Sequence, residues 1–115
     1  EEIMKRILTT AALLTAFSIA PALADPIEGN WKTKSGETAA ISSCGGSYCV
    51  TLKSGKHAGK RIGKMSGSNG KYSGSITDPA KDKTYSGNAT LSGNTLKMQG
   101  CVLKVLCRSE NWSRI

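Results

Sequence analysis

The densest group of side chains that could do chemistry runs from Asp78 to Tyr85 and includes two carboxylates, two lysines and a phenol. Carboxylates and a tyrosine at the rim of a β-sheet could orient a ligand or accept a proton. The same segment is also typical of a turn, because Asp-Pro opens a turn, Asp82 suits its tip and Tyr85 starts the next strand. We favour the turn and retain Asp78, Lys83 and Tyr85 as candidate binding residues.

A basic cluster lies earlier in the chain, and a hairpin that carried it could hold an anionic lipid head group or a glycan phosphate. The alternative is a solvated turn with the outer faces of two strands. His57 is the only histidine, and with no neighbouring Cys, Asp or Glu it gives little support for a metal site or a catalytic dyad. The cluster consists of Lys53, Lys56, His57, Lys60, Arg61 and Lys64, of which Lys56, Lys60 and Arg61 are the candidate binding residues.

The two tryptophans, Trp31 and Trp112, could stack on a sugar or a lipid. They lie near the two ends of the folded part, which would be neighbouring strands if a sheet closed into a barrel. Core packing, in which each ring buries a large area, is the favoured interpretation. The sequence contains no Ser-His-Asp order, glycine-rich phosphate loop or HExxH string, so we expect no enzyme, no cofactor and no metal.

All four cysteines follow residue 24, and an even number of cysteines in a small exported domain is typical of disulfides. Three connectivities are open, and we favour the local pairs, Cys44 with Cys49 and Cys101 with Cys107. Each closed loop is short, so the chain-entropy model gives about 2–3 kcal/mol for each bridge. Zinc is the rival interpretation, but the ligand spacing and the exported compartment argue against it.

Residues 1–24 are predicted to be an export signal rather than part of the fold. A positive head, Lys5-Arg6, precedes an apolar run over residues 7–20, which is shorter than the roughly 20 residues of a membrane-spanning helix. Ala22-Leu23-Ala24 matches a cleavage site, so the mature chain would begin at Asp25 in the periplasm or outside the cell. An uncleaved N-terminal anchor is the alternative.

Residues 25–115 have the length of one small domain, which benefits from covalent staples because it buries a limited fraction of its surface. Residues 1–3 start with two acids where an export signal is basic, and we interpret them as a start-site artefact. The chain carries 16 Lys and Arg against 8 Asp and Glu, a formal net charge of +8. In an exported protein this charge favours an anionic envelope surface or an acidic small ligand over nucleic acid, or it simply maintains solubility. We expect no transmembrane segment after signal cleavage, and the oligomeric state stays open.

After residue 24 the sequence is typical of short β-strands, because helical periodicity is absent and Gly and Ser recur. Signals rich in Gly, Asn, Asp and Pro separate eight candidate strands, each one turn from the next. This order predicts an all-β fold, either an up-and-down antiparallel barrel or a highly curved meander. The candidate strands cover residues 30–34, 37–44, 47–53, 60–67, 71–77, 83–91, 94–103 and 105–114.

Alternation along these strands places cysteines on the opposite face from the aliphatic side chains. Val50 and Leu52 share one parity while Cys49 has the other, and Met98 opposes Cys101 in the same way. We therefore expect both bridges to clamp hairpins from outside the core. The expected core consists of Trp31, Ile41, Val50, Leu52, Ile62, Tyr72, Ile76, Tyr85, Leu91, Leu96, Met98 and Trp112.

Several short motifs follow one another after residue 24, namely Gly29-Asn30-Trp31, Cys44-Gly45 with Cys49, Asp78-Pro79, Lys83-Thr84-Tyr85, Leu96, Gly100-Cys101, Cys107 and Trp112-Ser113-Arg114. In this order and spacing they resemble a bacterial family, domain of unknown function 2147. The resemblance covers nearly all of residues 25–115. It implies an exported envelope protein with a small β-barrel, broadly similar to lipocalin or streptavidin barrels, and no established activity.

Two departures from the family pattern concern its turns. Many members have Gly where this chain has Asp82, and Asp tolerates similar turn conformations. Many members also have a longer loop with an Asn-Pro between the third and fourth strands, where this chain has only residues 54–60. Ligand contacts made by that loop in relatives are therefore not transferred to this chain.

These observations favour an exported, non-catalytic protein that binds a small apolar or amphipathic ligand. The obstacle is volume, because eight short strands leave an interior that side chains can nearly fill. The alternative is a basic module that docks on anionic envelope polymers or on another exported protein. An enzyme is the third and least favoured hypothesis.

Overall fold

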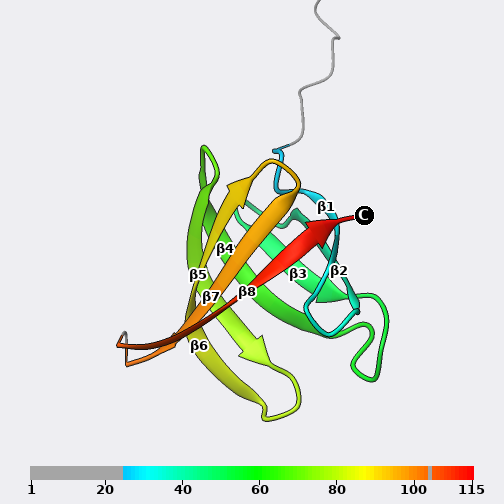
Figure 1. Cartoon of the computed structure of the whole chain (residues 1–115), viewed down its shortest axis with the longest axis vertical. Helices are drawn as coiled ribbons and strands as arrows, with labels where there is room; N and C mark the ends of the chain where they lie inside the picture. Colours follow the sequence, from blue (N-terminus) through cyan, green and yellow to red (C-terminus); the bar gives the residue numbers. More distant parts are fainter. Residues whose placement is uncertain (1–24, 104) are drawn as a thin grey trace, which may run out of the picture.

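The computed structural model describes residues 25–103 and 105–115, which form eight antiparallel strands closed into a barrel (Figure 1). Strands adjacent in sequence are adjacent in the sheet, and β1 pairs with β8 to complete the ring. The predicted up-and-down barrel is confirmed, whereas the predicted export signal lies outside the described residues. The strands are β1 (Gly29–Lys32), β2 (Thr38–Ser43), β3 (Tyr48–Leu52), β4 (Arg61–Ser68), β5 (Lys71–Asp78), β6 (Lys83–Ser92), β7 (Thr95–Val102) and β8 (Leu106–Arg114).

The turns between strands use residues that accept left-handed backbone. Asn69 and Gly70 join β4 to β5 with φ of 55° and 81°, which is the pattern of the tight hairpin turns that Asn-Gly favours. Asp82, in the β5–β6 turn, has φ of 53°. The turn therefore keeps the left-handed conformation that glycine would adopt there, as expected for Asp.

Both favoured disulfides are present, Cys44 with Cys49 and Cys101 with Cys107. The first spans the β2–β3 turn, and the second joins direct cross-strand partners of β7 and β8. None of the four cysteines belongs to the apolar core, although Cys49 and Cys101 are almost fully covered. Both bridges therefore clamp hairpins beside the core, and they indicate an oxidising environment.

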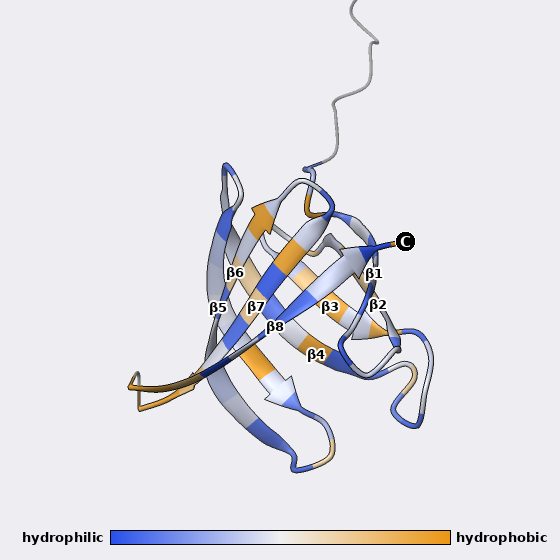
Figure 2. Ribbon diagram, in the orientation of Figure 1, coloured by the Kyte–Doolittle hydropathy of each residue, from blue (hydrophilic) through white to orange (hydrophobic). Residues whose placement is uncertain are grey.

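The apolar core contains most of the residues expected from alternation. Hydrophobic segments recur along several strands of the barrel (Figure 2). Ile76 and Leu91 are only partly buried and pack against the core. Tyr85 is a correction, because it is half-buried and stands outside the core. The β6–β7 pairing begins at Ser86, so Tyr85 has a strand partner only on the β5 side, Ile76, and lacks cover from β7. The sequence reading missed Ile27, Ala39, Met65 and Ala89, which are all buried.

The segment before β1 closes one end of the barrel. Ile27 is completely buried, and its carbonyl accepts a hydrogen bond from the Trp31 indole at 3.0 Å. Arg114, the last residue of β8, donates to two carbonyls of this segment at 2.5 and 3.2 Å. Its guanidinium carbon also lies 4.2 Å from the centroid of the Trp31 ring, a cation–π contact. Residues 25–28, which precede β1, therefore form a cap on the barrel and are called the cap below.

Asp25 ties the cap to the barrel wall. Its carboxylate accepts hydrogen bonds from the Tyr72 hydroxyl at 2.5 Å and from the Ile27 amide at 2.9 Å. Burial raises the pKa of Asp25, but hydrogen bonding from Tyr72, Ile27 and Tyr48 outweighs it and lowers the pKa below the ordinary 3.8. The pKa values of the Tyr72 and Tyr48 hydroxyls are raised above the ordinary 10.0. Burial is the largest cause, and the nearby Asp25 carboxylate is the next.

Three glycines lie side by side across the barrel wall, because Gly74 pairs with Gly87 and Gly87 pairs with Gly100. A Cβ at Gly74 would collide with the carbonyl oxygen of Lys64, and one at Gly87 would lie 2.6 Å from the Ile76 side chain. At Gly100 the nearest atom would be 3.8 Å away, an ordinary contact. We call these three residues the glycine row. It lets strands approach closely where the sheet coils.

Replacing Tyr72 with Phe removes the hydrogen bond to Asp25, and we expect a loss of about 1 kcal/mol in the free energy of unfolding at neutral pH. The stabilisation from the depressed Asp25 pKa is present above pH 3.8 and is lost as pH falls through the folded pKa. The stabilisation from the raised Tyr72 pKa is present below pH 10.0 and is lost as pH rises through the folded pKa. Urea unfolding across pH should therefore show shallower acid and alkaline limbs in Tyr72→Phe. Equal limbs in the two proteins would contradict this account, and Tyr85→Phe is the matched control.

Replacing Gly74 with Ala should destabilise the barrel by at least about 2 kcal/mol, because the new methyl group meets rigid backbone. Gly100→Ala is the matched control, since the same methyl group there makes only ordinary contacts. Thermal unfolding of both variants measures the difference. A Gly74→Ala protein as stable as Gly100→Ala would refute the close approach of β5 to β4.

Candidate ligand-binding cavity

The end of the barrel opposite the cap holds a half-open cavity of about 1030 Å³. The β1–β2, β3–β4, β5–β6 and β7–β8 connections all contribute to its lining, so the cavity opens where these four connections converge. The expectation that side chains would nearly fill the interior is correct for the capped end and wrong for this one. The cavity is therefore the main candidate site.

The floor of the cavity is apolar and its rim is charged. Leu52, Ile62, Met98 and Trp112 are buried and line the floor, and the half-buried Ile76 joins them. The rim carries both signs of charge, which suits a ligand with an apolar body and a polar end. Its charged residues are Lys34, Glu37, Asp78, Lys81, Arg108 and Glu110.

The glycine row explains why space remains at this end. Gly100 lines the cavity. The space that a side chain would occupy there is open, because the nearest atom to a Cβ at Gly100 would belong to Tyr85, 3.8 Å away. At the neighbouring Gly87, the Ile76 side chain occupies the space that a Cβ would need and packs against the glycine backbone. A bulky residue at Gly100 would fill part of the interior, so the hollow depends on its absence.

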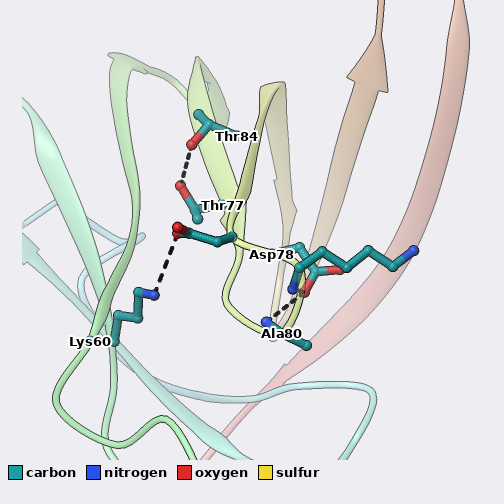
Figure 3. A network of polar contacts seen from close by, with 7 residues as sticks. Lys60, Thr77, Asp78, Ala80 and Thr84 are labelled. Atoms are coloured by element: carbon teal, nitrogen blue, oxygen red, sulfur yellow. Dashed lines mark hydrogen bonds and ion pairs between the residues drawn. The ribbon is translucent and has the colours of Figure 1, made fainter.

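Asp78 is the last residue of β5, and its side chain holds the β5–β6 turn at the rim (Figure 3). Its carboxylate accepts hydrogen bonds from the backbone amides of Ala80 at 2.9 Å and Lys81 at 3.4 Å. The hydroxyls of Thr77 and Thr84 are hydrogen-bonded at 2.8 Å across the same hairpin. One carboxylate oxygen therefore serves the turn, and the outer face of the hairpin is tied by a second bond.

An ion pair joins this hairpin to the preceding loop. The Lys60 ammonium lies 3.7 Å from the Asp82 carboxylate, and both side chains are largely exposed. Such a pair contributes little to stability, on the order of 0–1 kcal/mol. It places Lys60 of the basic cluster beside the β5–β6 turn.

The candidate residues fall into three places. Asp78, Tyr85 and Trp112 line the cavity, with Trp112 donating its indole hydrogen to Glu110 at 2.7 Å. Trp31 is buried at the capped end as expected for core packing, and Lys83 is exposed opposite Asp78 in the strand register. Lys56, Lys60 and Arg61 are exposed and do not line the cavity, although His57 between them does.

Sequence reasoning missed several residues of the cavity. Arg108 and Glu110 share the inward parity of Trp112 on β8, so alternation counted back from the tryptophan would have found them. Val105 and Leu106 also line the cavity, from a hairpin tip that alternation alone does not place. Gly100 was noted as part of a motif, but its lack of a side chain was not recognised as a source of volume.

No group of three or more His, Cys, Asp or Glu side chains within residues 25–103 and 105–115 is arranged to hold a metal ion. In the same part of the chain, no helix has the length and apolar character needed to cross a membrane.

Replacing Asp78 with Ala removes the acceptor that holds two backbone amides, and we expect a loss of about 0.5–1 kcal/mol in the free energy of unfolding. Asp78→Asn keeps an acceptor oxygen and should retain most of that stability. Chemical denaturation of both variants distinguishes the stability that comes from the hydrogen bonds of the turn from the stability that comes from the carboxylate charge. Equal losses in the two variants would show that the carboxylate charge, rather than the turn, matters there.

A family model described as "Uncharacterized protein conserved in bacteria (DUF2147)" matches residues 52–114, more than half of the 115-residue chain. The matched part begins at the end of β3 and includes the glycine row, the rim turn at Asp78 and the Cys101–Cys107 bridge. No curated protein and no solved structure matches the chain. The chain therefore belongs to the bacterial DUF2147 family of uncharacterised proteins.

Proposed function

We propose that this protein binds a small amphipathic ligand in the open end of the barrel and does not catalyse its conversion. The observation that carries the proposal is the half-open cavity of about 1030 Å³ with an apolar floor and a charged rim. Ligand pockets in proteins typically measure about 300–1,000 Å³. The cavity therefore has room for a molecule of lipid or metabolite size.

The chemistry of the lining narrows the ligand class. An apolar body would lie against Met98, Ile62 and Trp112, where its burial is favourable by about 25 cal/mol for each Å² removed from water. A polar or charged end would remain at the mouth, where Arg108 and Lys81 could pair with an acid. A fatty acid or a related single-chain amphiphile fits both requirements.

The acids of the rim support binding rather than catalysis. Asp78 holds the turn amides, while Glu110 accepts hydrogen bonds from the Trp112 indole and, at 3.4 Å, from the Lys34 amide. Glu37 accepts a hydrogen bond from Ser35 at 3.3 Å. The partners of these carboxylates are backbone amides, an indole and a hydroxyl, and none of them is a second titratable group that would tune a general base. We therefore propose no reaction at this site.

We also propose that the protein works in the periplasm or outside the cell. The two disulfides support an oxidising compartment. The sequence pattern of residues 1–24 supports export, with cleavage after Ala24. An envelope location would place the cavity among membrane lipids and their single-chain products.

Replacing Gly100 with Leu tests the cavity, because the new side chain enters it without a backbone collision. A titration with brominated dodecanoic acid should quench Trp112 fluorescence in the purified protein, and Gly100→Leu should bind at least tenfold more weakly. Asn111→Leu adds the same side chain to an exposed position of β8 outside the lining and should bind as the unaltered protein does.

Trp112→Phe locates the quenching, since the remaining Trp31 lies in the capped end. Quenching that persists in Trp112→Phe, or equal affinity in Gly100→Leu, would contradict binding in the cavity.

The second candidate function is a basic module that docks on anionic envelope polymers. It is favoured by the stretch from Lys53 to Ser68, which carries five bases, all exposed, and no acid. Absence of fatty-acid binding, together with binding to lipopolysaccharide that weakens as salt rises, would favour this function over the first. The bases are Lys53, Lys56, Lys60, Arg61 and Lys64.

A further inference from the structure

The β7–β8 hairpin ends in a projecting apolar tip, defined here as Val102, Leu103, Val105 and Leu106 (Figure 2). Their exposed fractions are 42, 84, 75 and 70%, and among large hydrophobic residues of the described chain only Ile115 shares such exposure. The tip extends away from the barrel wall in Figure 1. Such a concentration of exposed aliphatic side chains marks an interaction site in a soluble domain.

Leu103 carries the strongest signal of this tip. It is the most exposed large hydrophobic residue, and its φ of 54° puts it in the left-handed region, which leucine rarely adopts. Asn or Gly would suit this turn better on both counts. A contact outside the chain would give a physical reason for an exposed leucine in this conformation.

The shape of the tip fits a fluid apolar medium better than a flat protein face. Val102, Val105 and Leu106 line the cavity and Leu103 does not, so the tip carries exposed apolar surface beyond the cavity lining as well as within it. Leu103 stands two residues beyond the disulfide at Cys101, which is about 7 Å of strand. Interfacial elements enter the boundary of a bilayer by about 5–10 Å, which matches this reach.

The charge near the tip fits an anionic surface. In the sequence, Lys104 falls within the tip segment and Arg108 follows it, and the first acid after them is Glu110, which lies opposite Met98 in the strand register. The whole chain has a net charge of +8, which attracts the protein to anionic lipid. The Cys101–Cys107 bridge holds the base of the hairpin, so less conformational freedom is lost when the tip inserts.

We propose that the apolar tip inserts into the interface of an anionic phospholipid bilayer and docks the protein there. The docked orientation brings the cavity mouth to the lipid surface, because Val105 and Leu106 belong to both. The inference depends on the tip and not on a ligand in the cavity. It also uses different residues from the basic cluster of the β3–β4 loop.

The test is co-flotation of the purified protein with vesicles of phosphatidylglycerol and phosphatidylethanolamine in equal parts. We expect binding that weakens as salt rises and a partition coefficient at least tenfold lower for Leu103→Asn, because one leucine provides a large share of the inserted apolar area. Asn accepts the left-handed turn, so the fold should be retained. Ile115→Asn, at an exposed aliphatic position near the capped end, is the matched control and should bind normally.

A second measurement reports insertion directly. Leu103→Trp should show a blue-shifted emission with these vesicles and quenching by brominated lipid. No vesicle binding by the unaltered protein, or equal binding by Leu103→Asn, would overturn the proposal. A dimer in lipid-free solution that dissociates in Leu103→Asn would also overturn it, because the tip would then contact a second copy. Loss of fatty-acid binding in Gly100→Leu with vesicle binding intact would separate this inference from the proposed function.

Discussion

The absence of side chains along the glycine row constrains the rest of this barrel. At Gly74 no side chain fits between β5 and the Lys64 carbonyl of β4, and at Gly87 the Ile76 side chain occupies the space of a Cβ. A row of such positions allows a sheet of short strands to coil tightly enough to close. Toward the cap, the strands bring large side chains inward and pack them. Toward the mouth, Gly100 leaves volume, so one backbone feature separates a packed half from a hollow half.

The capped end compensates for a weak seam. β1 and β8 close the ring through only two register pairs, Trp31 with Arg114 and Lys32 with Ser113. The Arg114 side chain adds two hydrogen bonds to the cap and a cation–π contact with Trp31, so the seam is held by side chains as much as by the ladder. The cap carbonyls in these contacts are therefore hydrogen-bonded within the chain. The mouth keeps its charged residues at the surface, where a ligand could reach them.

Much of the fold could be predicted from the sequence, because period-2 alternation and turn residues mark strands locally. The hairpins around Asn69-Gly70 and the bridge between Cys101 and Cys107 follow from neighbours within a few residues. The cap and the cavity could not be predicted in this way. The burial of Ile27 depends on strands distant in sequence, and the effect of Gly100 depends on which residues lie across the barrel. Tyr85 was placed wrongly because alternation gives the face of a side chain but not whether a neighbour covers it.

The Cys101–Cys107 bridge is better understood through its position than through its contribution to global stability. A loop this short gains only about 2 kcal/mol from restriction of the unfolded chain. The bridge lies where β7 and β8 extend beyond the barrel wall, and hairpin ends of this kind open locally at little cost. Beyond it, four exposed aliphatic residues would expose still more apolar surface if the strands separated. A covalent link at that point keeps the tip in one shape. The capped end combines the Cys44–Cys49 bridge of the β2–β3 turn with packing and hydrogen bonds of the cap. Each end of the barrel therefore has one disulfide, but only the capped end is also closed by packed side chains, which leaves the open end free to present apolar surface without loss of the fold.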